Sequence, residues 1–161
     1  MPARKSGLLA TKATMNRFGL SFHHLALAIR EPEAAHRFLT GLGYSAGESV
    51  YDPEQRVNLT IFTALVGHPD IEVVSPADVP GPLDAVLKCD RERIYHVCYT
   101  SEDPAASVAA MREAGLRVMP VSPEKPAVLF GNSLVCFHYV QGIGLIEILH
   151  RQGEKKAGPC G

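Results

Sequence analysis

An internal repeat constrains this sequence more than any other feature does. The strand-like stretch Phe22–Ile29 contains His24, and a second such stretch, Ile94–Thr100, contains His96. In both copies a proline lies eight residues after the histidine and a glycine lies nineteen residues after it: Pro32 and Gly43 in the first, Pro104 and Gly115 in the second. A strand, a helix that begins at proline and a glycine that ends it therefore recur in register.

Each histidine lies on a strand face that small side chains otherwise line. At the period of two that a strand imposes, His24 shares its face with Ala26, and His96 shares its face with Cys98. A hollow is therefore expected beside each imidazole. The same alternation places His23, the nearest rival to His24, on the opposite face.

The rest of the chain predicts one α+β domain of two βαβββ modules. Module one covers about 21–75 and module two about 94–150, joined by a linker rich in proline at 76–82. The first helix begins at Pro32 and carries an apolar stripe with Phe38, Leu39 and Leu42. Further strands are expected at 44–50, 57–62, 71–74, 117–121, 133–140 and 143–149, with short helices at 83–88 and after an N-cap at Asp103, and a loop at 122–126.

Length and composition limit the classes of function. The 161 residues, 46% of them hydrophobic, suit a single domain at 21–150 between a basic extension at 1–20 and a polar tail at 151–161. A net charge of −1 with mixed signs gives no reason to expect nucleic acid or a membrane surface as a partner, and no apolar run could span a bilayer.

The four cysteines predict a reducing compartment. Cys89, Cys98, Cys136 and Cys160 form no CxxC pair, so we expect free and mostly buried thiols, and a cytoplasmic protein.

Two glutamates lie in strands that are otherwise almost wholly apolar. Glu72 follows His24 by 48 residues and Glu147 follows His96 by 51, so the repeat reproduces the histidine–glutamate pair. Each carboxylate could instead face solvent on an edge strand. If a carboxylate were buried, it would destabilise the fold by several kcal/mol, on the order expected for a buried ion, unless it were paired or bound to a metal.

Two imidazoles and two carboxylates brought together by a pseudo-twofold axis suit one divalent cation. Co, Ni, Zn, Mn and Fe all accept this mixture of nitrogen and oxygen ligands. The metal ligands predicted from the repeat are His24, Glu72, His96 and Glu147. Among the remaining histidines, His36, His68 and His150 are expected in solvent, and His138 is expected either near the site or packed elsewhere.

These stretches resemble the metal-binding strands of the vicinal oxygen chelate superfamily, which includes glyoxalase I, methylmalonyl-CoA epimerase, extradiol dioxygenases and resistance proteins for fosfomycin and bleomycin. The resemblance covers roughly residues 20–150 and rests on Phe22–Ile29, Ile71–Pro76, Ile94–Tyr99 and Gly144–Leu149. It implies two βαβββ modules that form an open barrel around a metal site, and it implies a homodimer, which sedimentation velocity would test.

Within the superfamily, the sequence is most similar to methylmalonyl-CoA epimerase, with differences. Glu54–Val57 and Gly81–Lys88 resemble that family. Epimerases often have glutamine at the position of Glu72, whereas a His/Glu/His/Glu set resembles bacterial glyoxalase I. Some epimerases also carry an acid on the strand that holds Asn58–Thr60, where this chain has none, and Phe130–Tyr139 differs from the usual epimerase segment.

The resemblance implies an enzyme that removes a proton beside a carbonyl whose oxygens chelate the metal. Glu147 is the first candidate for the catalytic base, with Glu72 on the opposite side as its partner. The expected activity is that of a metal-dependent isomerase or lyase acting α to a thioester or ketone, like methylmalonyl-CoA epimerase, with an acyl-CoA or another thioester as the small-molecule substrate. The alternatives are a lactoylglutathione lyase like glyoxalase I, a protein that binds a drug or metabolite without chemistry, and a member of a biosynthetic pathway.

Overall fold

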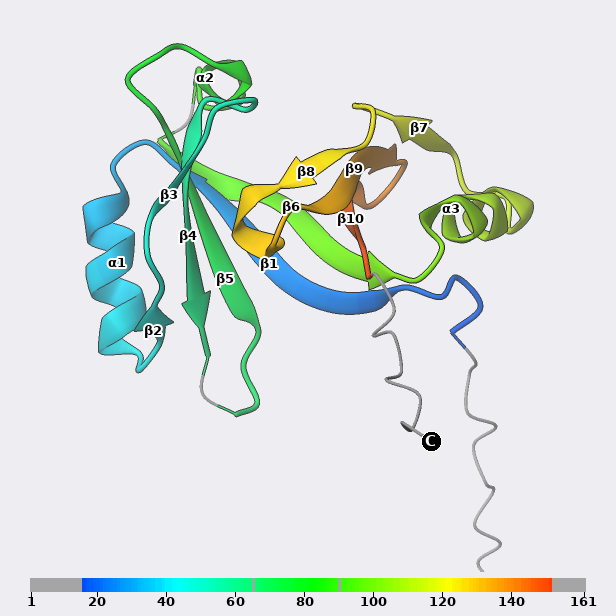
Figure 1. Ribbon diagram of the computed structural model, residues 1–161, viewed down its shortest axis with the longest axis horizontal. Coiled ribbons are helices and arrows are strands. Elements are labelled where there is room, and N and C mark those ends of the chain that lie inside the picture. Colours follow the sequence, from blue (N-terminus) through cyan, green and yellow to red (C-terminus); the bar gives the residue numbers. More distant parts are fainter. Residues whose placement is uncertain (1–15, 65, 90, 152–161) are drawn as a thin grey trace, which may run out of the picture.

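The computed structural model describes residues 16–64, 66–89 and 91–151, and in them ten strands form one mixed sheet with helices on its outer side (Figure 1). The first half contains β1 (Ser21–Ile29), α1 (Pro32–Gly41), β2 (Ser45–Ala46), β3 (Val50–Asp52), β4 (Val57–Thr63), β5 (Asp70–Pro76) and α2 (Pro82–Val86). The second contains β6 (Glu92–Ser101), α3 (Pro104–Glu113), β7 (Val118–Pro120), β8 (Lys125–Ala127), the 3₁₀-helix η1 (Val128–Phe130), β9 (Ser133–Val140) and β10 (Gly144–His150).

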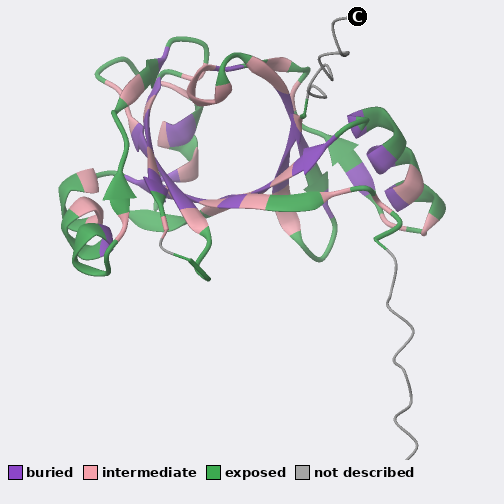
Figure 2. Cartoon of the chain, turned by 60° about the horizontal axis from the view of Figure 1, so that its bottom comes forward, coloured by how far each residue is buried: buried purple, intermediate pink, exposed green. Residues whose placement is uncertain are grey.

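The order of the strands shows the predicted repeat. Antiparallel β1 and β6 lie at the centre, β5 pairs in parallel with β1, and β10 pairs in parallel with β6. Antiparallel β4 and β9 follow on the two sides, so that β4-β5-β1 in one half corresponds to β9-β10-β6 in the other. The sheet curves into an open barrel, with α1 and α3 outside it on opposite sides (Figure 2). Buried apolar side chains of the strands also pack on the outer face, around Leu39 of α1 and around Met111 of α3. The α+β class and the open barrel are confirmed.

The two main helices begin and end as the sequence predicts. Both have proline in the first turn, and in α3 the Asp103 carboxylate caps the helix by accepting a hydrogen bond from the Ala106 amide at 2.9 Å. Gly43 and Gly115 follow the two helices with φ of 94° and 84°, a left-handed conformation that glycine adopts without strain.

Three local predictions were wrong. The strand expected at 44–50 is divided into β2 and β3, which both pair with β4. The segment expected to be a loop at 122–126 ends within β8, whose residues pair with β9. The apolar stripe expected from Pro32 on is buried only at Leu39, while Phe38 on α1 and Leu42 just after it are mostly exposed.

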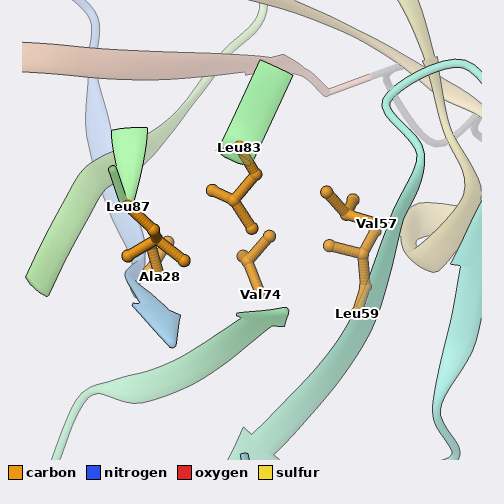
Figure 3. Close-up of a cluster of buried hydrophobic side chains, with 7 residues drawn as sticks. Ala28, Val57, Leu59, Val74, Leu83 and Leu87 are labelled. Atoms are coloured by element: carbon orange, nitrogen blue, oxygen red, sulfur yellow. The ribbon is translucent and has the colours of Figure 1, made fainter. Parts of the chain in front are cut away.

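A cluster of apolar side chains fills the barrel beneath α2. Leu83 and Leu87 extend from the α2 segment toward Ala28, Val57, Leu59 and Val74 on the sheet (Figure 3). Leu83 is 2% exposed and Leu87 is 1% exposed, and full burial of a leucine stabilises a fold by roughly 1.5–3 kcal/mol. The cluster closes one end of the barrel and supports strands β4 and β5 beside the predicted site.

The predicted terminal segments lie mostly outside the described residues, which include only 16–20 of the extension and Arg151 of the tail. Phe18 and Leu20 of this extension pack, partly buried, against the core cluster around Ile148. The division into extension, domain and tail stays a prediction. No helix among the described residues is long and apolar enough to cross a bilayer.

Candidate metal centre

The four predicted ligands lie on the four central strands of the sheet. His24 is on β1, Glu72 on β5, His96 on β6 and Glu147 on β10, and these strands are neighbours in the order β5-β1-β6-β10. All four side chains are almost wholly buried, with exposed fractions between 0% and 5%. The alternative in which the two glutamates face solvent on edge strands is therefore wrong.

Strand register explains why these side chains meet. Ala26 on β1 lies opposite both His96 on β6 and Glu72 on β5. Residues that are paired across a sheet point to the same face, so a row is formed with the small alanine in its middle.

The second row repeats the first. Cys98 on β6 lies opposite both His24 on β1 and Glu147 on β10. The small side chains of Ala26 and Cys98 thus separate each histidine from a glutamate in its row, and leave space over the sheet in which the four longer side chains converge.

The distances within this group are short and nearly symmetric. Nε2 of His24 lies 3.5 Å from Oε2 of Glu72 and 3.8 Å from Oε2 of Glu147. Nε2 of His96 lies 3.7 Å and 3.3 Å from the same two oxygens. Each imidazole therefore faces both carboxylates at once.

The group fits a divalent cation by its unpaired atoms and by its charge. Nε2 of both histidines and Oε2 of Glu147 are buried and have no hydrogen-bond partner among the described residues. Buried polar atoms are rarely left in this state. In the forms in which they bind metals, two carboxylates and two imidazoles carry a charge of −2, which a divalent cation would neutralise. Ligand atoms of His24, His96 and Glu147 lie within 4.8 Å of one another.

The environment of Glu147 favours its ionised form. Burial alone would raise the pKa of this carboxyl, but the close approach of His96 at 3.3 Å, with His24 and the Cys98 thiol nearby, lowers the pKa below its ordinary value. The ionised carboxylate is the form that binds metals and accepts protons.

His23 does not lie where simple alternation predicted. The β1–β6 register shifts between Phe22 and His24, so His23 is the extra residue of an irregular, bulged step. Its ring turns back toward its neighbour, and Nδ1 of His23 lies 2.8 Å from Nδ1 of His24. Burial lowers the pKa of His23 and His24 lowers it further, which favours a neutral ring at neutral pH.

The second copy has a similar irregularity at Tyr95. The register skips this residue between Ile94 and His96, and its ring lies 5.0 Å from that of His96. Burial raises the pKa of the Tyr95 hydroxyl, as do the charges of Glu147 and Glu72. The residue that precedes each histidine therefore lies beside the site. The sequence held a signal for this, because an aromatic residue precedes the histidine in both copies: His23 before His24 and Tyr95 before His96.

A small cavity adjoins three of the four groups, Glu72, His96 and Glu147. Its volume is about 20 Å³, enough for one water or ion, and its lining includes Leu59, Tyr95 and Phe130. Asp52 lies at its edge, where its carboxylate accepts hydrogen bonds from the Gln55 side chain at 2.8 Å and from two backbone amides. Sequence analysis missed Asp52 and Phe130 because neither belongs to the repeated strands.

The other histidines lie away from this centre. His138 is buried on β9 but lines a separate surface hollow with Arg112 and Cys136, so it is a packed histidine. His68 is exposed, whereas His36 is half-buried against the Phe62 ring and His150 lies within 3.0 Å of the Glu102 carbonyl. The expectation that all of His36, His68 and His150 are solvated was therefore right only for His68.

Comparison with known proteins decides the family. Residues 23–137, more than half of the chain, match the Glyoxalase/Bleomycin resistance protein/Dioxygenase superfamily. The chain belongs to this superfamily. The match includes three of the four site residues, and Glu147 lies ten residues beyond its end.

Epimerases are among the relatives within this superfamily. An ethylmalonyl-CoA/methylmalonyl-CoA epimerase of Cereibacter sphaeroides is 30% identical over 99 residues, which cover 60% of this chain and 72% of that protein. Methylmalonyl-CoA epimerase from Mycobacterium tuberculosis superposes with a TM-score of 0.62 at 20% identity, over 81% of this chain and 86% of that one. A methylmalonyl-CoA epimerase in complex with methylmalonyl-CoA and NH₄⁺ superposes with a TM-score of 0.60 at 18% identity, over 81% of this chain and 93% of that one.

The three cysteines among the described residues should differ strongly in their reactivity toward alkylating reagents. Burial, then the charges of Glu124 and Glu147, raises the pKa of Cys136 to about 11, and burial beside Glu147 raises the pKa of Cys98 further. A raised pKa keeps the thiol protonated up to a higher pH, and only the thiolate is nucleophilic. At pH 8 we expect iodoacetamide to label the exposed Cys89 and to spare Cys98 and Cys136, as peptide mapping by mass spectrometry can measure. Rapid labelling of Cys98 in the folded protein would contradict the structure.

Proposed function

We propose that this chain is a metal-dependent isomerase or lyase that moves a proton on the carbon next to a thioester or ketone carbonyl, in the manner of methylmalonyl-CoA epimerase. One observation carries the proposal: two imidazoles and two carboxylates converge in the buried centre of the sheet, and Nε2 of both histidines and Oε2 of Glu147 have no hydrogen-bond partner among the described residues. His24, Glu72, His96 and Glu147 would hold the cation. When bound, a divalent cation supplies positive charge that stabilises the negative charge developing on a substrate carbonyl oxygen.

In this proposal the two glutamates transfer the proton. Glu72 comes from β5 and Glu147 from β10, the strands that flank the central pair on its two sides. A carboxylate oxygen on one side of the substrate can take the proton from the α-carbon, and the other glutamate, in a protonated form that is not at that stage an ionised ligand, can return a proton to the opposite face, which inverts the configuration. Glu147 is the first candidate for the base because its surroundings keep it ionised.

The relatives favour an acyl-CoA as the substrate. The 30% identical relative is named as an epimerase of ethylmalonyl-CoA and methylmalonyl-CoA, and a protein of the same fold was solved with methylmalonyl-CoA bound. Both substrates are thioesters with an acidic α-proton, the chemistry to which paired carboxylates around a cation are suited.

A second candidate is isomerisation of a hemithioacetal, as in glyoxalase I. Two features favour it. Glu72 stands where epimerases often have glutamine, and Leu59, on the strand where some epimerases carry an acid, lines the cavity beside the site. This candidate uses the same four groups, so only the substrate distinguishes it. The homodimer and the cytoplasmic location stay predictions.

Metal content tests the ligand set. We expect the purified protein to bind one divalent ion per chain, and the single variants His24→Ala and His96→Ala to lose it while circular dichroism shows them folded, because each removes one of four ligands. Inductively coupled plasma mass spectrometry after dialysis measures the ion. His68→Ala, in an exposed turn, is the matched control and should retain the metal. Unchanged stoichiometry in both site variants would overturn the proposal.

Deuterium exchange tests the chemistry. Metal-loaded protein with methylmalonyl-CoA in heavy water should incorporate deuterium at the α-carbon, which mass spectrometry detects. Glu147→Gln keeps an oxygen ligand of similar size but removes the basic group, so exchange should fall by roughly 10² to 10⁴, the usual factor for a general base. Glu72→Gln should reduce exchange less, because epimerases often have glutamine at that position.

The outcomes separate the candidates. Turnover of the hemithioacetal of methylglyoxal and glutathione, without exchange on methylmalonyl-CoA, would favour the glyoxalase reaction. Bound metal with no exchange on either substrate would leave a binding protein.

A further inference from the structure

We infer that His23 is a positioning residue for the metal centre: it accepts a hydrogen bond from Nδ1–H of His24 and thereby directs Nε2 of His24 toward the two glutamates. This inference rests on the proposed function for its metal, but the hydrogen bond itself can be tested without it. Nothing in the strand alternation assigns His23 a role, since a regular strand would point it to the other face of the sheet.

The tautomers follow from the geometry. Nε2 of His24 faces Glu72 and Glu147 at 3.5 and 3.8 Å, so this is the nitrogen that would offer its lone pair to the proposed metal. A neutral imidazole then carries its proton on Nδ1 and needs an acceptor there. The Nδ1 atom of His23, 2.8 Å away, is the one partner that the described residues provide. His23 must therefore be neutral with its own proton on Nε2.

Packing holds the two rings in this arrangement. Phe130 of η1 stacks on His24 with an angle of 28° between the ring planes and meets His23 edge to face, with centroids 5.4 and 5.1 Å away. His24 is fully buried and His23 is half-buried. A hydrogen bond shielded from water in this way is stronger than an exposed one and fixes the plane of the imidazole.

The two halves of the repeat differ at this point. Tyr95 occupies the position in the second copy that His23 occupies in the first, but Nδ1 of His96 is buried without a hydrogen-bond partner among the described residues. Only the first copy thus supplies an acceptor behind its metal-facing histidine, and His24 should be the more rigidly oriented of the two.

Nuclear magnetic resonance tests the hydrogen bond directly. In protein labelled with ¹⁵N at histidine and loaded with zinc, we expect a slowly exchanging proton on Nδ1 of His24 and a scalar coupling from that nitrogen to Nδ1 of His23. The proton and the coupling should disappear in His23→Phe, which keeps an aromatic ring against Phe130 but has no acceptor. A wild-type His24 with its proton on Nε2, or no coupling between the two rings, would refute the inference.

Zinc affinity, measured by competition with a chelator, tests the consequence. Loss of such a partner typically weakens metal binding by about 10- to 100-fold, so His23→Phe should show that loss. His23→Asn places an amide oxygen near the position of Nδ1 and should restore most of the affinity, which a purely structural defect would not allow. His68→Phe, which removes an exposed histidine, is the control and should bind zinc like the wild type.

The other outcomes are distinct. Equal affinity of His23→Phe and wild type would show that the pair does not orient the ligand. Two zinc ions per chain, with the second lost in Cys98→Ala, would mean that His23, His24 and Cys98 bind a metal of their own, and would replace this inference. If wild type bound no zinc at all, the proposed function would fail, while the coupling in metal-free protein would still decide the hydrogen bond.

Discussion

In the antiparallel pairing of β1 with β6, Ala26 faces His96 and Cys98 faces His24. This register determines both the core and the candidate centre, because β5 and β10 pair in parallel with these strands and bring in Glu72 and Glu147 opposite the same two small residues. A slip of one residue would turn every side chain to the other face of the sheet. The apolar residues that alternate with the site residues therefore help to fix the site.

The energetic problem at this centre is its charge. Two carboxylates that are 5% exposed would cost several kcal/mol, on the order expected for buried ions, if they lacked partners. The imidazoles compensate in part, and they lower the pKa of Glu147, although its burial acts in the opposite direction. A divalent cation would compensate fully. Breaking a group of this kind by removing one member should therefore be far more harmful than changing a surface ion pair such as Arg91 with Glu31.

Sequence reasoning located the centre because a strand has a fixed period and the repeat supplied it twice. His24, His96 and two glutamates in apolar strands were enough to predict which four side chains converge, but not the order of the strands that carry them. The same reasoning misplaced His23, since a bulged step interrupts the period of two and no residue type marks it. Phe130 and Asp52 were missed for another reason: their contacts arise from tertiary packing of short segments, η1 and β3, that have no periodicity of their own.

X-ray absorption spectroscopy of the zinc-loaded protein tests the central claim most directly, because it reports the atoms around the ion whatever the substrate is. The account predicts two imidazole nitrogens and at least two oxygens at about 2.0–2.2 Å, with the outer-shell scattering of two histidine rings. It predicts no sulfur, although Cys98 lies between the ligands. A spectrum with a sulfur scatterer at about 2.3 Å, or with a single imidazole, would contradict it.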